Sequence, residues 1–181
     1  MKLVALGGSL RDNSLSAAAL RAALQAGRRA GADTELCDLR EMNLPLYRPE
    51  TSIEAYPLAA RTQITRFVSL CRDADAMLWA TPTYHGSMSG AFKNALDYID
   101  LLSDEPGPYL QGKAVGLISV SDPAPLASMA ACVPELRAWP APTRLTLCAA
   151  DFSDDLELAS APALRRLERL VGELLAFGRT P

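Results

Sequence analysis

The chain has 181 residues, of which 49% are hydrophobic and 22% charged, and its formal net charge is −3. Length and composition predict one globular domain, residues 1–181, with a substantial core. The small net charge and the scattered basic residues argue against a nucleic-acid partner, and no apolar run is long enough to span a membrane. We therefore expect neither a nucleic-acid nor a membrane partner.

The four cysteines are spread along the chain without a CxxC pair: Cys37, Cys71, Cys132 and Cys148. Because the chain also has only one histidine, His85, no structural zinc site and no other metal site is predicted. Buried free thiols in a reducing compartment are the simplest interpretation, so we expect a cytoplasmic protein.

The N-terminal stretch predicts a buried strand over residues 3–6, a tight glycine loop and a helix over Leu15–Arg29. The start of a helix presents unpaired N–H groups and a partial positive charge, so it attracts anions. The stretch favours a phosphate cradle, although an ordinary strand-to-helix turn with serine caps has the same residue types. The candidate anion-binding residues are Ser9, Arg11, Asn13, Ser14, Leu15 and Ser16.

The next part of the chain predicts a weaker strand over residues 34–39, nearer to a sheet edge. The proline-containing residues 40–57 form a long connection, which in a compact domain is often functional. A helix follows, because apolar residues recur at i, i+3, i+4 and i+7: Ile64, Phe67, Val68 and Cys71. It leads into a strand over residues 76–80, whose Trp79 is expected in the core.

The second half continues the alternation. A helix from about Ala91 follows the loop from Thr81 to Gly90. A strand over residues 114–120, a loop over 121–125 and a helix over about 126–136 come next, and Pro134 leaves the end of that helix open. The fifth strand covers residues 144–148. The last helix is strongly amphipathic, with one apolar side: Leu164, Leu167, Leu170, Val171, Leu174 and Leu175.

Five strands that alternate with helices predict an α/β fold with a parallel sheet covered on both faces. Such sheets bind ligands beyond the carboxyl ends of their strands, at the switch in strand order, so the loops after strands one, three and four meet there. The first loop offers an anion site, the loop Pro82–Ser87 offers a rigid, aromatic and glycine-containing surface, and the third offers Ser119 and Ser121. This combination suits a planar cofactor that carries a phosphate, and flavin mononucleotide (FMN) fits.

Two motifs resemble those of the NAD(P)H-dependent FMN reductase family. They read Gly8-Ser9-Leu10-Arg11-x-x-Ser14-x-Ser16 and Thr81-Pro82-x-Tyr84-x-Gly86-Ser87-x-Ser89-Gly90-x-x-Lys93-Asn94-x-x-Asp97. The resemblance implies a flavodoxin-like three-layer fold with FMN as cofactor and NAD(P)H as co-substrate. It also implies a homodimer or homotetramer, in which the helix that carries Lys93, Asn94 and Asp97 supports the second loop and the subunit contact.

The resemblance further assigns the ligand contacts. Ser9, Arg11, Ser14 and Ser16 would hold the FMN phosphate. The residues beside the isoalloxazine ring would be Pro82, Thr83, Tyr84, His85, Gly86 and Ser87, with Ser119 and Ser121 in the third loop. That loop departs from the family pattern, because it lacks the glycine that many members have there. Asp122 would place a negative charge near the ring edge if it pointed inward, and FMN would then be exchanged more readily.

The implied reaction passes hydride from NAD(P)H to flavin N5 and on to a small-molecule acceptor: a flavin, quinone, azo compound or metal oxyanion. No side chain is needed as acid or base, so no catalytic residue is predicted, and the backbone of His85 matters more than its ring. Two other functions stay open: a flavodoxin-type electron carrier and a flavin-free nucleotide-binding module.

Several of these residues also have simpler interpretations. Arg11 is a surface arginine beside a helix start in the simplest case, and Lys93 with Asp97 forms an i,i+4 pair. Trp139 belongs either to the core or to a subunit contact. Tyr84 is expected to act as a packing surface and not as a proton donor.

Overall fold

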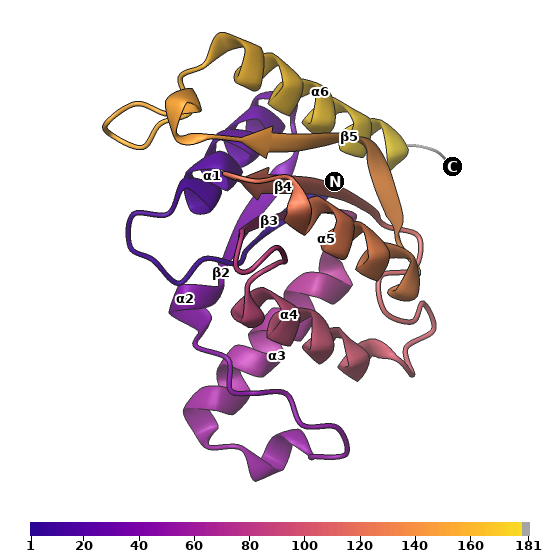
Figure 1. Ribbon diagram of the computed structural model, residues 1–181. Coiled ribbons are helices and arrows are strands. Elements are labelled where there is room, and N and C mark those ends of the chain that lie inside the picture. The colour runs from indigo at the N-terminus through magenta and orange to yellow at the C-terminus, as the bar shows by residue number, and fades with distance from the viewer. Residues whose placement is uncertain (179–181) are drawn as a thin grey trace.

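Five parallel strands form one sheet with helices on both faces in the computed structural model, which describes residues 1–178 (Figure 1). Residues 179–181, the end of the expected domain 1–181, lie outside the described residues. The sheet order is β2-β1-β3-β4-β5. The strands are β1 (Lys2–Gly7), β2 (Asp33–Asp38), β3 (Ala76–Pro82), β4 (Ala114–Val120) and β5 (Trp139–Leu147). The predicted α/β fold with a parallel sheet is confirmed, and the strand order is the one expected of a flavodoxin-like fold.

Six α-helices connect and cover the strands of the described chain. They are α1 (Leu15–Arg29), α2 (Leu39–Met42), α3 (Leu58–Asp73), α4 (Gly90–Asp97), α5 (Ala124–Glu135) and α6 (Ala161–Phe177). Figure 1 shows α1 and α6 on one face of the sheet and α3, α4 and α5 on the other. None of the described helices is long and apolar enough to cross a bilayer.

The core lies on both faces of β1, β3 and β4. Successive side chains of a strand point to opposite faces, so Val4 and Leu6 join the cluster under α3–α5, while Leu3 and Ala5 join the cluster under α1 and α6. Trp79 is fully buried, as predicted, and its ring meets that of Phe92 edge-on at 5.8 Å between centroids.

Two elements differ from the sequence-based expectation. β5 begins at Trp139, ahead of the predicted start, because its prolines are tolerated on an edge strand that needs fewer backbone donors. Trp139 itself is 61% exposed, so the interpretation as a core residue is wrong. α5 begins at Ala124, and Pro134 sits in its last turn.

The connection over residues 40–57 contains more structure than expected. The short helix α2 occupies its start, and a 3-10 turn over Ile53–Ala55 lies near its end. Asn94 of α4 holds the middle of the connection, accepting the N–H of Tyr47 at 2.8 Å and donating to the carbonyl of Pro45 at 2.9 Å. Partial burial and the Asp100 carboxylate, which accepts the Tyr47 hydroxyl, raise the pKa of Tyr47 to about 12.

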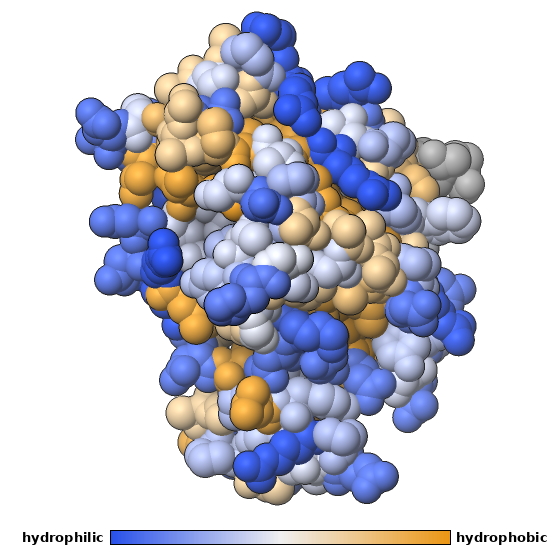
Figure 2. Space-filling view, viewed as in Figure 1, coloured by the Kyte–Doolittle hydropathy of each residue, from blue (hydrophilic) through white to orange (hydrophobic). Residues whose placement is uncertain are grey.

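The surface that Figure 2 shows is mixed, with hydrophilic residues spread among smaller apolar areas. Leu46, Leu58 and Trp139 are the most exposed large apolar side chains among the described residues. The first two lie on and beside the connection that leads to α3, and Trp139 starts the edge strand β5.

Candidate functional site

The first loop leaves the carboxyl end of β1 at the point where the strand order switches. Gly7 pairs with Asp38 of β2 on one side and with Ala80 of β3 on the other. The chain passes from β1 outward to β2 and only then to β3, so the loops after β1 and β3 lead to helices on opposite faces of the sheet and leave a crevice between them. The loop from Gly8 to Ser14 therefore lies at the expected ligand position of this fold.

Three hydroxyl groups of this loop are buried at the start of α1. Ser9, Ser14 and Ser16 are 6%, 5% and 3% exposed. Ser14 is the N-cap of α1 and accepts the N–H of Ala17 at 3.1 Å, while its Oγ lies 3.0 Å from that of Ser16. The Ser9 hydroxyl accepts the N–H of Arg11 at 3.2 Å. Hydrogen bonds of its own hydroxyls therefore stabilise the loop, and they place these hydroxyls at the helix N-terminus, which carries a partial positive charge.

The first and second loops are joined through Ser89. Its hydroxyl donates to the carbonyl of Gly8 at 2.5 Å and accepts the N–H of Phe92 at 3.1 Å, as the N-cap of α4. Phe92 also explains Gly8, because a Cβ there would meet the Phe92 side chain at 2.7 Å. Ser89 of the second motif and the neighbouring Phe92 therefore fix the position of the first loop.

The second loop ends in a tight two-residue hairpin turn. Tyr84 and Ser87 exchange both backbone hydrogen bonds, at 3.0 and 3.1 Å. His85 and Gly86 at the tip have φ angles of 50° and 78°, as a type I′ turn requires. Nothing lies within 4 Å of the position that a Cβ on Gly86 would take, so the turn faces open space.

The third loop is tied to the second. The Thr83 hydroxyl lies 3.4 Å from the carbonyls of both Val120 and Asp122, and the N–H of Ser121 donates to Leu147 at 2.8 Å. The Asp122 carboxylate accepts the N–H of Ala124 at 2.7 Å. It is therefore used at the start of α5, and Asp122 does not line the crevice.

A cavity of about 210 Å³ opens where these three loops meet. It is lined by Ser9, Arg11, Asn13, Ser14, Leu15, Ser16, Pro82, Thr83, Tyr84, Val120 and Ser121. The structure thus brings together all the candidate residues of the first loop with part of those from the second and third. Val120 is an addition, and its carbonyl faces the Thr83 hydroxyl.

The remaining candidates lie outside this lining. His85, Gly86 and Ser87 form the hairpin tip beside Tyr84. Ser119 is fully buried within β4, and its hydroxyl lies 3.1 Å from that of Thr146 on β5. Ser119 therefore supports the sheet below the third loop. Lys93 and Asp97 form an exposed i,i+4 ion pair on α4, which matches the simpler interpretation of these two residues.

A larger cavity, of about 600 Å³, lies between α1 and α6. No residue of the three loops belongs to its lining, which combines aliphatic side chains with polar and charged ones: Arg21, Gln25, Arg28, Arg29 and Glu157. Two of its arginines already have partners: Arg28 donates to the Thr34 hydroxyl at 2.6 Å, and Arg29 pairs with Glu168 at 3.2 Å. The predicted site residues therefore gather at the switch point and not in this larger cavity.

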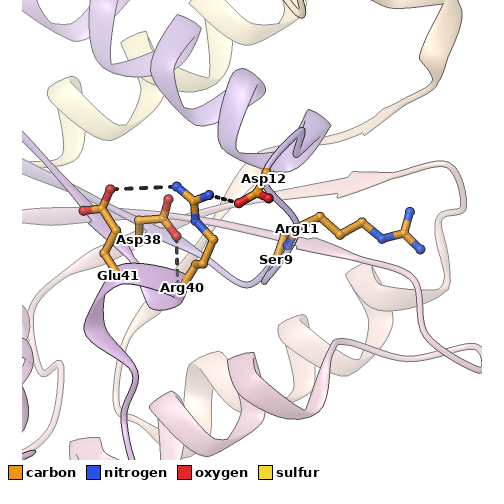
Figure 3. A network of polar contacts seen from close by, with 6 residues as sticks. All are labelled: Ser9, Arg11, Asp12, Asp38, Arg40 and Glu41. Carbon is orange, nitrogen blue, oxygen red and sulfur yellow. Dashed lines mark hydrogen bonds and ion pairs between the residues drawn. The ribbon is translucent and has the colours of Figure 1, made fainter.

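One charged residue near the first loop is not among those that the sequence motifs predict. Arg40 of α2 forms an ion pair with Asp12 at the tip of the loop (Figure 3). Arg40 is 28 positions away in the chain, and no spacing rule links the two residues. Only the pairing of β1 with β2 brings them together, so the sequence carried no signal for this contact.

The amino-acid sequence matches a known protein family and several of its characterised relatives. The profile of the family described as NADPH-dependent FMN reductase matches residues 1–143, which include all three loops. An NAD(P)H-dependent FMN reductase of Pseudomonas aeruginosa is 34% identical over 67% of this chain. An FMN-dependent NADPH-azoreductase of Staphylococcus saprophyticus is 30% identical over 80% of this chain and 78% of its own length. The matched region spans only 60% of the Pseudomonas protein.

Comparison with solved structures agrees on the fold. The flavoenzyme NAD(P)H:(acceptor) oxidoreductase FerB of Paracoccus denitrificans superposes with a TM-score of 0.73, at 21% identity over 98% of this chain and 96% of its own. A flavodoxin from the domain Archaea superposes with a TM-score of 0.63, at 14% identity over 99% of this chain and 100% of its own.

Proposed function

The chain belongs to the NADPH-dependent FMN reductase family, and on that premise we propose that it binds FMN across the three loops and reduces a small-molecule acceptor with NAD(P)H. The observation that carries this proposal is the cavity at the switch point, where a helix N-terminus with three buried hydroxyls meets the second loop at Pro82–Tyr84 and the third loop at Val120 and Ser121. Crevices of this kind in open α/β sheets hold nucleotide cofactors.

The first loop fits a phosphate group. The N-cap hydroxyl of Ser14 satisfies only the N–H of Ala17, and the helix geometry leaves the preceding N–H groups of α1 without intrahelical partners. Arg11 extends from the same loop and lines the cavity (Figure 3). Backbone donors, hydroxyls and one guanidinium are the groups that proteins use to bind a phosphate.

The second loop fits a flat ring. Pro82, Thr83 and Tyr84 line the cavity with a rigid backbone, and the Tyr84 side chain is 40% exposed beside it. The N–H groups of His85 and Gly86 are not used by the hairpin's own hydrogen bonds, so they are available to carbonyl and nitrogen atoms of a ring edge.

The third loop also fits, despite its lack of glycine. Asp122 is engaged with the N–H of Ala124, so its charge is directed to the start of α5. Ser121 adopts a φ of 77° and lines the cavity, taking the left-handed conformation that glycine adopts most readily. We therefore expect FMN to be retained.

In the proposed reaction, bound FMN supplies the two-electron chemistry between NAD(P)H and the acceptor. The chain's own residues bind and orient: the first loop holds the phosphate, and the hairpin and third loop fix the ring. We assign no catalytic side chain. The acceptor is a flavin, quinone, azo compound or metal oxyanion, and the FMN reductase and azoreductase names of the relatives support the first and third of these.

We also propose that the chain forms one domain and works in the cytoplasm as a homodimer or homotetramer. Core clusters on both faces of a single sheet support the one domain. Four free cysteines support a reducing compartment. Exposed Leu46, Leu58 and Trp139 are surfaces that a second copy of the chain would cover.

A visible absorption spectrum tests the proposed function. Purified protein is incubated with FMN, passed through a desalting column and scanned, and NADPH is then added without oxygen. We expect the absorbance of oxidised flavin to travel with the protein, to bleach with NADPH and to return when a quinone is added. Colourless protein would contradict FMN binding, and bound flavin that NADPH does not bleach would indicate an electron carrier.

A further inference from the structure

The pairing of β1 with β2 brings Arg40, a charged residue of α2, close to the first loop. Gly7, which precedes the loop, pairs with Asp38, which ends β2. Asp38 is the N-cap of α2, and its carboxylate accepts the N–H of Arg40 at 3.0 Å. The direction of Arg40 is thus set by the end of a neighbouring strand.

From that position the Arg40 guanidinium reaches Asp12. Its Nη1 donates to the Asp12 Oδ1, and its Nη2 lies 4.0 Å from Glu41 (Figure 3). Figure 3 shows Arg11 extending away from this pair, on the other side of the loop. The loop therefore carries two arginines with different surroundings: Arg40 is engaged with carboxylates, and Arg11 lines the cavity.

Asp12 is an unexpected residue at this place. It lies between Arg11 and Asn13, which both line the cavity. A carboxylate here repels a bound phosphate, because two like charges near a protein surface interact unfavourably even in partly exposed positions. An ion pair of Asp12 with Arg40 removes most of that repulsion.

We propose that Arg40 is a positioning residue for phosphate binding: it neutralises Asp12 and holds it on the side of the loop away from Arg11. This inference rests on the proposed function, because it names a residue that adjusts the affinity of the same FMN site. Arg40 need not touch FMN, and nothing in the sequence motifs assigns it a role.

The ion pair between Arg40 and Asp12 contributes little to the free energy of unfolding. The side chains of Arg40 and Asp12 are 37% and 90% exposed, and ion pairs at such positions contribute little to stability. The effect of Arg40 should therefore appear in the binding of a charged ligand and not in the melting temperature.

The experiment measures the dissociation constants of FMN and of riboflavin, which lacks the phosphate, by quenching of flavin fluorescence. Wild-type protein is compared with Arg40→Ala, Arg40→Lys, Asp12→Asn and the double variant Arg40→Ala/Asp12→Asn. Arg72→Ala is the matched control, because Arg72 is exposed to a similar extent as Arg40 and pairs with Glu105 at 2.9 Å, at the end of α3 remote from the three loops.

We expect Arg40→Ala to weaken FMN binding about threefold at low salt, and less at high salt, because Asp12 is exposed and its repulsion of the phosphate is screened. Riboflavin affinity should not change. Arg40→Lys and the double variant should bind FMN within about 1.5-fold of wild type, because lysine still neutralises Asp12 and the double variant removes both charges of the pair. Arg72→Ala should match wild type for both ligands.

Three results would overturn the inference: unchanged FMN affinity in Arg40→Ala, an equal loss of riboflavin affinity, or no recovery in the double variant. The last two would mean that Arg40 shapes the loop instead of balancing its charge. Wild-type protein that binds neither flavin would overturn the proposed function together with the inference, whereas wild-type binding without an Arg40 effect would overturn the inference alone.

Discussion

Ser14 shows how one side chain serves both folding and the proposed site. Its hydroxyl caps α1 by accepting the N–H of Ala17, and it lies at the cavity within 3.0 Å of the Ser16 hydroxyl. The loss of an N-cap hydroxyl lowers stability by about 1 kcal/mol wherever it occurs. An effect on FMN binding, in contrast, is expected only at a cap that faces the ligand.

Replacement of Ser14 by alanine should weaken FMN binding at least about tenfold, since a hydrogen bond to a charged group contributes on the order of 1.5–3 kcal/mol. Ser160→Ala is the control, because Ser160 caps α6 in the same way, accepting the N–H of Ala163. Both variants should lose similar stability in urea denaturation, but only Ser14→Ala should lose FMN affinity by fluorescence titration. If Ser14→Ala and Ser160→Ala bound FMN with equal affinity, the phosphate would not lie in this loop.

Gly86 gives a second residue-scale prediction. Its φ of 78° strains any side chain, and Gly112 has the same strain, with a φ of 79° and open space at its Cβ. Leucine at either position should cost similar stability, but only Gly86→Leu should block FMN, because only Gly86 lies at the hairpin beside the cavity. If Gly86→Leu bound FMN as well as Gly112→Leu did, the ring would not lie along the hairpin.

At the scale of elements, the site depends on how β1, β3 and α4 are held together. Ser89 is 2% exposed, and its hydroxyl bonds both to the carbonyl of Gly8 and to the N–H of Phe92. The N–H of Ser89 in turn donates to the fully buried Thr81 hydroxyl at 3.0 Å. One buried chain of hydrogen bonds therefore joins the first loop, the end of β3 and the start of α4.

Replacement of Ser89 by alanine leaves two buried backbone groups without partners, so it should lower the free energy of unfolding by about 1–3 kcal/mol. It should also loosen the first loop and weaken FMN binding. Ser128→Ala is the comparison, because the Ser128 hydroxyl bonds only to the carbonyl of Pro125 within α5. A Ser89→Ala protein with the urea midpoint of Ser128→Ala would show that the two loops are not coupled through this hydroxyl.

The length of an element and its place in the sheet decide whether it could be predicted from the sequence. The 3.6-residue apolar period predicted α1 with its observed bounds, and the short apolar runs predicted β3 and β4. α2 has only four residues, too few to show a helical period, so the sequence predicts only a connection there. β5 begins with prolines, which normally argue against a strand, and only its position at the sheet edge makes them acceptable.

The candidate site was predictable only where local chemistry marks it. Glycine, serine and proline in fixed order predicted the three loops that the cavity joins. Arg40 lies 28 positions from its partner Asp12 and depends on the register of β1 against β2. Ser119 lies within β4, where its side chain is buried and its hydroxyl meets that of Thr146 on β5, so it does not reach the cavity. Contacts of this kind follow from strand order and register, which no single motif encodes.

At the scale of the whole molecule, the thiols report on the integrity of the core. Cys37 and Cys71 lie buried in the cluster under α3–α5, whereas Cys148 is exposed after β5 and Cys132 is half-buried. Burial raises the pKa of the Cys37 thiol to about 12 and raises the pKa of Cys71 well above its ordinary value. The reactive thiolate of these two residues is therefore scarce at neutral pH.

Alkylation with iodoacetamide at pH 8 should modify Cys148 first and Cys132 more slowly, while Cys37 and Cys71 should react only when urea unfolds the protein. Peptide mass spectrometry measures the four rates, and bound FMN should not change the rate at Cys148 by more than about twofold, since no thiol lines the cavity. Rapid modification of Cys71 in the native protein would contradict the packing of the core.

The most direct test of the central claim is a crystal structure of the protein with FMN. We expect the phosphate at the N-terminus of α1, among Ser9, Ser14 and Ser16, with the ring beside Tyr84 and the hairpin turn. Flavin found elsewhere, for example in the larger cavity between α1 and α6, would contradict the claim that the three loops form the FMN site.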